Sequence, residues 1–190
     1  QEIAISALTR GSQTVEPQDV SGKIFVPRTE AEIWQELDKF IGMASVKAEI
    51  RSIVDDIKET KRSKGNDVQV EIRDHFVFTG NPGTGKTTMA RCFADILNAL
   101  GVLPKGHLVE VGSKDLIGDV IGASERNVRE AVDKSMGGIL FIDEAYGLND
   151  GTSYGQGAID TLLKLVEDNR GKFICILAGY SKEMGDFMRQ

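Results

Sequence analysis

The run GNPGTGKT, residues 80–87, constrains this chain more than any other stretch because it satisfies the pattern G-x-x-x-x-G-K-[ST]. A short apolar strand, residues 75–79, is predicted before it, and an amphipathic helix, residues 86–100, after it. In this context the N–H groups of the loop and the helix N-terminus point at phosphate oxygens. The run therefore predicts a phosphate-binding loop between a strand and a helix.

Two residues of this loop carry the chemistry that the pattern predicts. Lys86 is expected to reach the β and γ phosphates of a nucleotide, and Thr87 is expected to hold Mg²⁺ through its hydroxyl. Glycine is needed beside them because a β-carbon would block the approach of phosphate to the backbone. The predicted nucleotide-binding residues of this segment are Asn81, Pro82, Gly83, Thr84, Gly85, Lys86, Thr87 and Thr88.

The run ILFIDE, residues 139–144, supplies two acids at the end of another apolar strand. Asp143 is expected to hold the water shell of Mg²⁺ and so to complete the cofactor-binding set. Glu144 is expected to orient or deprotonate a water aimed at the γ-phosphate. Solvated strand ends often carry acids, so the pair is informative only together with the phosphate-binding loop. The predicted metal ligands are Thr87 and Asp143, and the predicted catalytic residues are Lys86 and Glu144.

ATP is favoured over GTP as the nucleotide. A strand, residues 107–111, lies in sequence between the two motifs, and a glutamate follows the acid that binds Mg²⁺. Both features favour the P-loop proteins that hydrolyse ATP with their own glutamate. The chain has no Asn-Lys-x-Asp guanine signature. We therefore expect ATP and Mg²⁺ as the cofactors.

Strands and helices alternate through most of the chain, which predicts an α/β protein with a parallel sheet covered on both faces. This is the three-layer P-loop NTPase architecture, in which ligands bind at the carboxyl ends of the strands. We expect residues 1–28 to be a tail or linker and residues 29–190 to form the core. The predicted strands are residues 75–79, 107–111, 139–143 and 173–178, and the predicted helices that follow the first three are residues 86–100, 124–136 and 158–168.

Composition narrows the possible partners and compartments. The formal charge of −6 and the pI near 5.0 disfavour binding to nucleic acid or to an anionic membrane. No apolar run approaches the roughly 20 residues that span a bilayer. Cys92 and Cys175 fall inside apolar patterns, which predicts buried free thiols and a cytoplasmic location. His75 and His107 border strands without a nucleophile, so we expect core or capping roles for them.

Five motifs in order make the resemblance to one family specific. The chain resembles the AAA+ ATPases of the CbbX-like group, which includes red-type Rubisco activases, the sporulation stage V protein K and ATPases of type VII secretion. The resemblance covers about residues 37–188. It implies an ATP-driven homo-oligomeric ring, usually a hexamer, that remodels or threads a protein client. The motifs are GNPGTGKTT (80–88), KGHLVEV (105–111), DLIGDVIG (115–122), GGILFIDEAYGL (137–148) and ILAGY (176–180).

The resemblance also assigns two positions around the nucleotide. Ile41 and Gly42 resemble the backbone segment that flanks adenine, a role that is compatible with a turn between two helices. The polar sensor of the family is expected near Gly179 and Tyr180. Tyr180 offers a hydroxyl for that role, and the alternative is that its ring only packs.

Two loops resemble segments that face the central pore of the ring. Residues 119–122 resemble the first pore loop, in which an aromatic residue usually grips the client. Val120 occupies that position, so the loop either grips a threaded chain or packs against a neighbouring subunit. Residues 149–157, with Tyr154, correspond to a second pore-facing loop, and a flexible Gly-rich linker would look the same.

The resemblance places an arginine finger, a fifth strand and a small helical lid with a second sensor after the region that ends at Gln190. We therefore expect an AAA+ large subdomain truncated before the helical lid, with slow hydrolysis and weak assembly. None of Arg126, Arg129 and Arg170 is assigned as the finger. Arg126 and Arg129 are expected to be solvated or to lie at a subunit interface.

Two functions follow from this sequence. The first is an Mg²⁺-dependent ATPase that, as a ring, remodels a protein partner. The alternative is a nucleotide-gated assembly scaffold without productive threading, which the aliphatic Val120 and the unusual sensor position favour. A small-molecule kinase shares the phosphate-binding loop but not the Asp-Glu pair or the order of the motifs.

Overall fold

The computed structural model describes residues 29–39, 44–65 and 67–189. The tail or linker predicted for residues 1–28 and the adenine-flanking role predicted for Ile41 and Gly42 lie outside these residues. The description below follows the chain from Thr29 onward.

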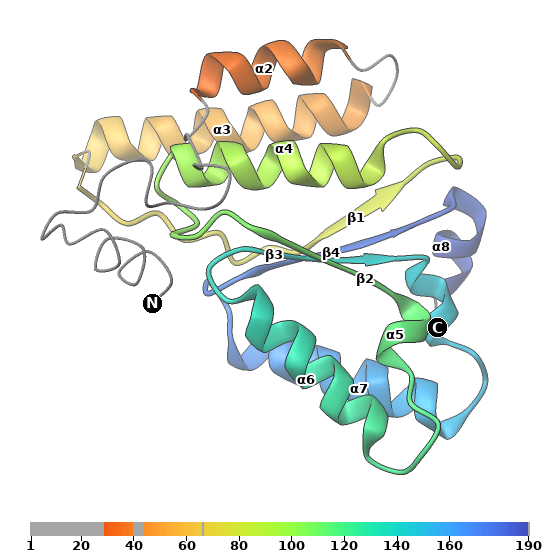
Figure 1. Ribbon diagram of the computed structural model, residues 1–190. Helices are drawn as coiled ribbons and strands as arrows, with labels where there is room; N and C mark the ends of the chain where they lie inside the picture. Colours follow the sequence, from red (N-terminus) through yellow and green to blue (C-terminus); the bar gives the residue numbers. More distant parts are fainter. Residues whose placement is uncertain (1–28, 40–43, 66, 190) are drawn as a thin grey trace, which may run out of the picture.

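The centre of the structure is a sheet of four parallel strands in the order β1-β4-β3-β2 (Figure 1). Strand β4 therefore lies between β1, which leads into the phosphate-binding loop, and β3, which ends in the acids. All four carboxyl ends meet at one edge of the sheet. The strands are β1 (Phe76–Thr79), β2 (Leu108–Gly112), β3 (Ile139–Asp143) and β4 (Ile174–Gly179).

Helices cover both faces of the sheet, as the alternating pattern predicted. Figure 1 shows α2 (Glu30–Lys39), α3 (Ala44–Lys64) and α4 (Lys86–Ala99) on one face, and α6 (Ala123–Ser135) and α7 (Ser153–Asp168) on the other. No helix in the described part of the chain is long and apolar enough to cross a membrane. Three short helices directly follow strand ends, namely α5 (Ser113–Leu116), η2 (Ala145–Leu148) and α8 (Ser181–Phe187).

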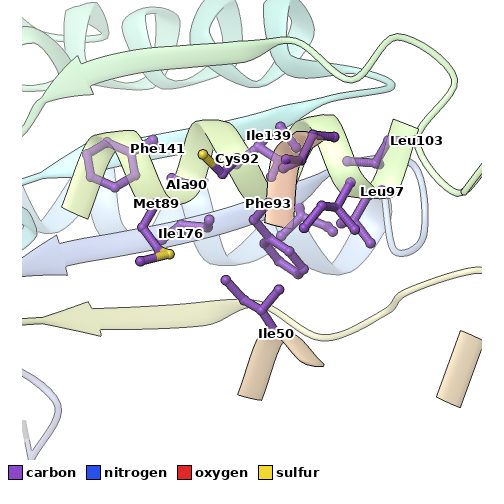
Figure 2. Close-up of a cluster of buried hydrophobic side chains, with 14 of the residues drawn as sticks. Ile50, Met89, Ala90, Cys92, Phe93, Leu97, Leu103, Ile139, Phe141 and Ile176 are labelled. Carbon is purple, nitrogen blue, oxygen red and sulfur yellow. The ribbon is translucent and has the colours of Figure 1, made fainter. Parts of the chain in front are cut away.

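Two hydrophobic clusters hold these layers together, one on each face of the sheet. Ile139 and Phe141 of β3 belong to the cluster under α2, α3 and α4, whereas Leu140 and Ile142 belong to the cluster under α6 and α7. This division follows from the period of two along a strand. Burial on both faces explains why β3 is an unbroken apolar run. Figure 2 shows part of the first cluster, where Phe93 of α4 points toward Ile50 of α3.

The predicted start of α7 was wrong. The glycine-rich residues 153–157 were expected to belong to a loop, but the helix begins at Ser153. Thr152 caps it, because its hydroxyl oxygen accepts a hydrogen bond from the N–H of Gly155 at 3.1 Å. A β-carbon at Gly155 would lie 2.3 Å from the carbonyl oxygen of Leu148. Gly155 therefore permits a close contact inside a helix, and Tyr154 lies in the first helical turn instead of a loop.

Both histidines have capping roles, as predicted. The Nδ1 atom of His75 accepts a hydrogen bond from the N–H of Cys175 at 2.9 Å, and Nε2 of His107 lies 2.7 Å from the carbonyl oxygen of Lys134. Burial, together with the nearby Arg170 charge, lowers the pKa of His75 below its ordinary value. Cys92 and Cys175 are buried and form no disulfide, also as predicted.

Replacing Phe93 with alanine is expected to lower the free energy of unfolding by about 3–5 kcal/mol, because it opens a cavity in the cluster under α4. Phe93 is fully enclosed and meets the ring of Phe76 edge-on, with the centroids 5.3 Å apart. Urea unfolding measures the change, with Leu163→Ala as the control because Leu163 is exposed. Equal losses in the two variants would contradict the assignment of Phe93 to the core.

His75 is expected to make stability fall as the pH drops below about 6.5. The folded state lowers the pKa of His75 from 6.5, so the unfolded state binds more protons in that range. The contribution of neutral His75 to the free energy of unfolding is fully present above pH 6.5 and is lost as the pH falls through the folded-state pKa. Urea unfolding of the native chain and of His75→Gln between about pH 5 and pH 8 tests this. The difference in the free energy of unfolding between the two proteins should change below pH 6.5 and stay constant above it.

Candidate active site

The phosphate-binding loop, residues 80–87, leaves β1 and enters α4 through two glycines with left-handed backbone angles. Gly83 has φ 73° and Gly85 has φ 85°, a region that residues with a β-carbon rarely adopt. Gly85 is the N-cap of α4, and its carbonyl oxygen accepts from the N–H of Met89 at 2.9 Å. Thr84 closes the loop by donating its hydroxyl to the carbonyl oxygen of Asn81 at 2.9 Å. The loop is thus held by its own contacts.

Lys86 is a buried cation, only 9% exposed, at the start of α4. Its Nζ donates to the carbonyl oxygens of Gly80 and Asn81 at 3.0 and 3.2 Å and lies 5.5 Å from the ring centroid of Tyr180. No ion pair among the described residues involves Lys86. A buried charge held by neutral groups attracts an anion strongly. The donor set of this site therefore fits a phosphate group.

Glu144 has an unusual backbone conformation directly after β3. Its φ of 50° and ψ of 42° are left-handed, and it is the one non-glycine residue with a positive φ in the described ranges. Its N–H donates to Oδ1 of Asp143 at 3.0 Å, and its carbonyl oxygen accepts from the N–H of Gly147 at 2.8 Å. Such a conformation costs about 1–2 kcal/mol. Strain of this kind gathers at functional sites, where it aims a side chain.

Two tyrosines extend the site along the ends of β3 and β4. The rings of Tyr146 and Tyr180 lie 5.8 Å apart, so Tyr180 contacts both Tyr146 and Lys86. Burial and the neighbouring Glu144 carboxylate raise the pKa of Tyr146 above its ordinary value. A β-carbon at Gly179 would come within 2.9 Å of the Tyr146 ring and 2.8 Å of Met184. Gly179 thus lets Tyr146 lie across the end of β4.

The predicted site residues gather at the carboxyl edge of the sheet. Lys86 and Thr87 open α4 after β1. Asp143 is the last residue of β3, and Glu144 follows it. Tyr180 follows β4. Its ring packs against neighbouring side chains, as one of the two alternatives predicted. A sensor role for its hydroxyl stays a prediction.

The first loop predicted to face a pore is strongly exposed. Val120 is 63% exposed and Ile121 is 94% exposed, between α5 and α6. The N–H of Ala123 donates to the carbonyl oxygen of Val120 at 3.0 Å, which turns the chain into α6. Away from this loop, Arg170 forms an exposed ion pair with Glu167 at 3.0 Å.

One contact at this site was missed by sequence reasoning. The Thr87 hydroxyl donates to Oε1 of Glu110 at 3.4 Å, and the guanidinium of Arg91 lies 3.2 Å from Oε2 of the same carboxylate. Glu110 lies in the middle of β2, on the side that faces α4. A charged residue at an alternate position of an otherwise apolar strand was the available signal.

In a comparison with known proteins, residues 76–187 match the model of a family described as the ATPase family associated with various cellular activities (AAA). The chain is 44% identical over 160 residues to Stage V sporulation protein K of Bacillus subtilis, a match that covers 83% of this chain and 50% of that protein. It is 43% identical over 163 residues to Protein CbbX of Cereibacter sphaeroides, covering 83% and 53%. It is also 41% identical over 164 residues to ESX-1 secretion system protein EccA1 of Mycobacterium tuberculosis, covering 83% and 28%.

These relatives are longer than the chain. The chain spans about half the length of the sporulation protein and of CbbX, and less of EccA1. Among solved structures, the crystal structure of the FIGL-1 AAA domain in complex with ADP matches with a TM-score of 0.52 and 20% identity. That match covers 76% of this chain and 49% of the other and supports the fold.

Replacing Glu144 with glycine is expected to give a protein that is about 1–2 kcal/mol more stable than the Glu144→Ala variant, because glycine adopts the left-handed region without strain. Urea unfolding of the two variants measures the difference. The same pair of substitutions at Glu130, in the interior of α6, is the matched control. There alanine should be favoured, by about 1 kcal/mol. The same order at both positions would contradict the strained conformation at Glu144.

Proposed function

Because this chain belongs to the AAA family of ATPases, we propose that it binds ATP with Mg²⁺ and hydrolyses it. The observation that carries this proposal is Lys86, a buried cation held by carbonyl oxygens and an aromatic ring at the N-terminus of α4. Asp143 and Glu144 lie at the same edge of the sheet. A buried cation and two acids at one edge suit the binding and cleavage of a phosphoanhydride.

Each residue has a defined task in this proposal. Residues 83–85 offer backbone N–H groups to the phosphates, and Lys86 binds the β and γ phosphates. Asn81 and Pro82 shape the loop before them, and Pro82 has no N–H to donate. Thr87 and Asp143 supply hard oxygen ligands that suit Mg²⁺. When bound, Mg²⁺ neutralises charge that develops on the phosphate oxygens. Glu144 orients a water and accepts its proton.

Further contacts complete the nucleotide site. Ile41 and Gly42 are proposed to flank adenine, and Thr88 to contact the phosphates from the first turn of α4. The Tyr180 hydroxyl is proposed as the sensor of the γ-phosphate, supported by the contacts of the Tyr180 ring with Lys86 and with Tyr146.

We further propose that the whole protein forms a homo-oligomeric ring that remodels a protein client. The family resemblance implies that this ring is a hexamer. The exposed Val120 and Ile121 support a contact with a client or with a neighbouring subunit. An arginine from a neighbouring subunit can contribute about 10³–10⁵ to the rate of phosphoryl transfer. Hydrolysis is therefore expected to be slow where such an arginine does not reach the site. Cys92 and Cys175 are buried and form no disulfide, which fits the reducing cytoplasm.

A second candidate function is a nucleotide-gated assembly scaffold without productive threading. The observation in its favour is the exposed loop tip, where Val120 and Ile121 are aliphatic and offer no aromatic grip. A scaffold would need the nucleotide bound but would not need Glu144 to act. The variants Glu144→Gln and Lys86→Ala separate the two candidates.

Replacing Glu144 with glutamine is expected to leave ATP binding intact and to lower turnover by about 100-fold or more, because the amide does not accept the proton of the attacking water. Replacing Lys86 with alanine should remove ATP binding, because the buried cation is lost. ATP binding is measured with a fluorescent analogue, and turnover by phosphate release at several protein concentrations.

The Lys86→Ala variant gives the blank for both measurements. Specific activity of the native chain that rises with protein concentration would support subunits that complete each other's sites. Full turnover in Glu144→Gln would overturn the assigned role of Glu144. Partner function that survives in Glu144→Gln would favour the scaffold.

A further inference from the structure

We propose that Glu110 is a positioning residue that orients the Thr87 hydroxyl toward Mg²⁺. This inference rests on the proposed function, because it concerns the same Mg²⁺·ATP site. Glu110 does not belong to the phosphate-binding loop or to the acid pair, and it acts through Thr87. The argument starts from where Glu110 lies on β2.

Glu110 lies on the edge strand β2, and its side chain is partly exposed on the face of the sheet that α4 covers. On one face of β2, Val109 and Val111 pack against the cluster under α6 and α7. On the other face, Leu108 packs against the cluster under α4. Because side chains alternate along a strand, Glu110 points to the same face as Leu108. Its neighbour in register on β3 is the fully buried Phe141.

The two carboxylate oxygens of Glu110 have separate partners on one side of α4. Oε1 accepts the Thr87 hydroxyl at 3.4 Å, and Oε2 pairs with the Arg91 guanidinium at 3.2 Å. Thr87 and Arg91 are four residues apart, so they lie one above the other on the helix. Arg91 pairs with one oxygen of the carboxylate, which leaves the other free to accept the Thr87 hydroxyl.

This contact matters because a threonine hydroxyl has one proton and two lone pairs. When Thr87 donates its proton to Glu110, the lone pairs remain available to a cation. A hydrogen-bond acceptor that receives the proton of a metal ligand fixes the orientation of that ligand and raises the basicity of the ligand. Losing such a partner typically weakens metal binding about 10–100-fold. Glu110 would therefore tune the affinity for Mg²⁺ without touching the nucleotide.

The competing explanation is an ion pair that only ties α4 to the edge of the sheet. The side chains of Arg91 and Glu110 are 57% and 44% exposed, and pairs of this kind contribute little to stability. Under that explanation, removing Arg91 would have the same effect as removing Glu110. Under our proposal the two substitutions differ, because only Glu110 contacts Thr87.

The test measures binding of a fluorescent ATP analogue to the full chain in EDTA and during a titration with Mg²⁺. Glu110→Ala is expected to raise by about 10-fold the Mg²⁺ concentration that gives half of the maximal change in analogue binding. Its affinity for the analogue in EDTA should not be weaker than that of the native chain. Glu110→Gln keeps a carbonyl oxygen as acceptor, so its Mg²⁺ requirement should lie closer to that of the native chain than to that of Glu110→Ala. Arg91→Met should stay near the native value.

Three results would overturn the proposal. An unchanged Mg²⁺ requirement in Glu110→Ala would remove the role of Glu110. An equal loss in Glu110→Gln would show that the charge, and not the hydrogen bond, is what matters. An equal loss in Arg91→Met would show that the ion pair is responsible. If the native chain bound no nucleotide with or without Mg²⁺, the proposed function would fail first, and this inference with it.

Discussion

The parallel pairing of β1, β4 and β3 is the constraint on which the candidate site depends. Thr79 pairs with Gly179 at the end of β4, and Gly112 pairs with Asp143 at the end of β3. Parallel strands end at the same edge, so segments far apart in the sequence deliver their side chains to one place. The phosphate-binding loop, the acid pair and Tyr180 are neighbours for this reason. The two hydrophobic clusters pack this sheet between its two layers of helices.

The site that results holds two residues in unfavourable states. Lys86 is buried against two carbonyl oxygens and the ring of Tyr180, an environment in which a charge is poorly solvated. Glu144 keeps a left-handed backbone conformation that its side chain disfavours. The surrounding core, which includes Phe93 of α4, must stabilise these residues. Burial of apolar side chains in the core thus offsets the cost of the strained and buried residues at the strand ends.

The two edges of the sheet differ in what they expose. Strand β2 lies at one edge and carries Glu110 toward α4, where it joins Thr87 and Arg91. At the other edge, Val77 of β1 is partly exposed and apolar. The charged edge borders the proposed Mg²⁺ site, so a substitution there is expected to alter the chemistry more than the fold.

The sequence by itself determined the order of the strands along the chain, the phosphate-binding loop and the acid pair, because each is written in a contiguous run of residues. The burial of the two thiols followed from local apolar patterns in the same way. Other features depend on contacts between distant segments, which no local pattern contains. Examples are the hydrogen bond between Thr87 and Glu110, 23 residues apart, and the contact of Lys86 with Tyr180. The start of α7 at Ser153 and the strained Glu144 were likewise decided by tertiary structure, because close packing at Gly155 and the turn after β3 override local preference.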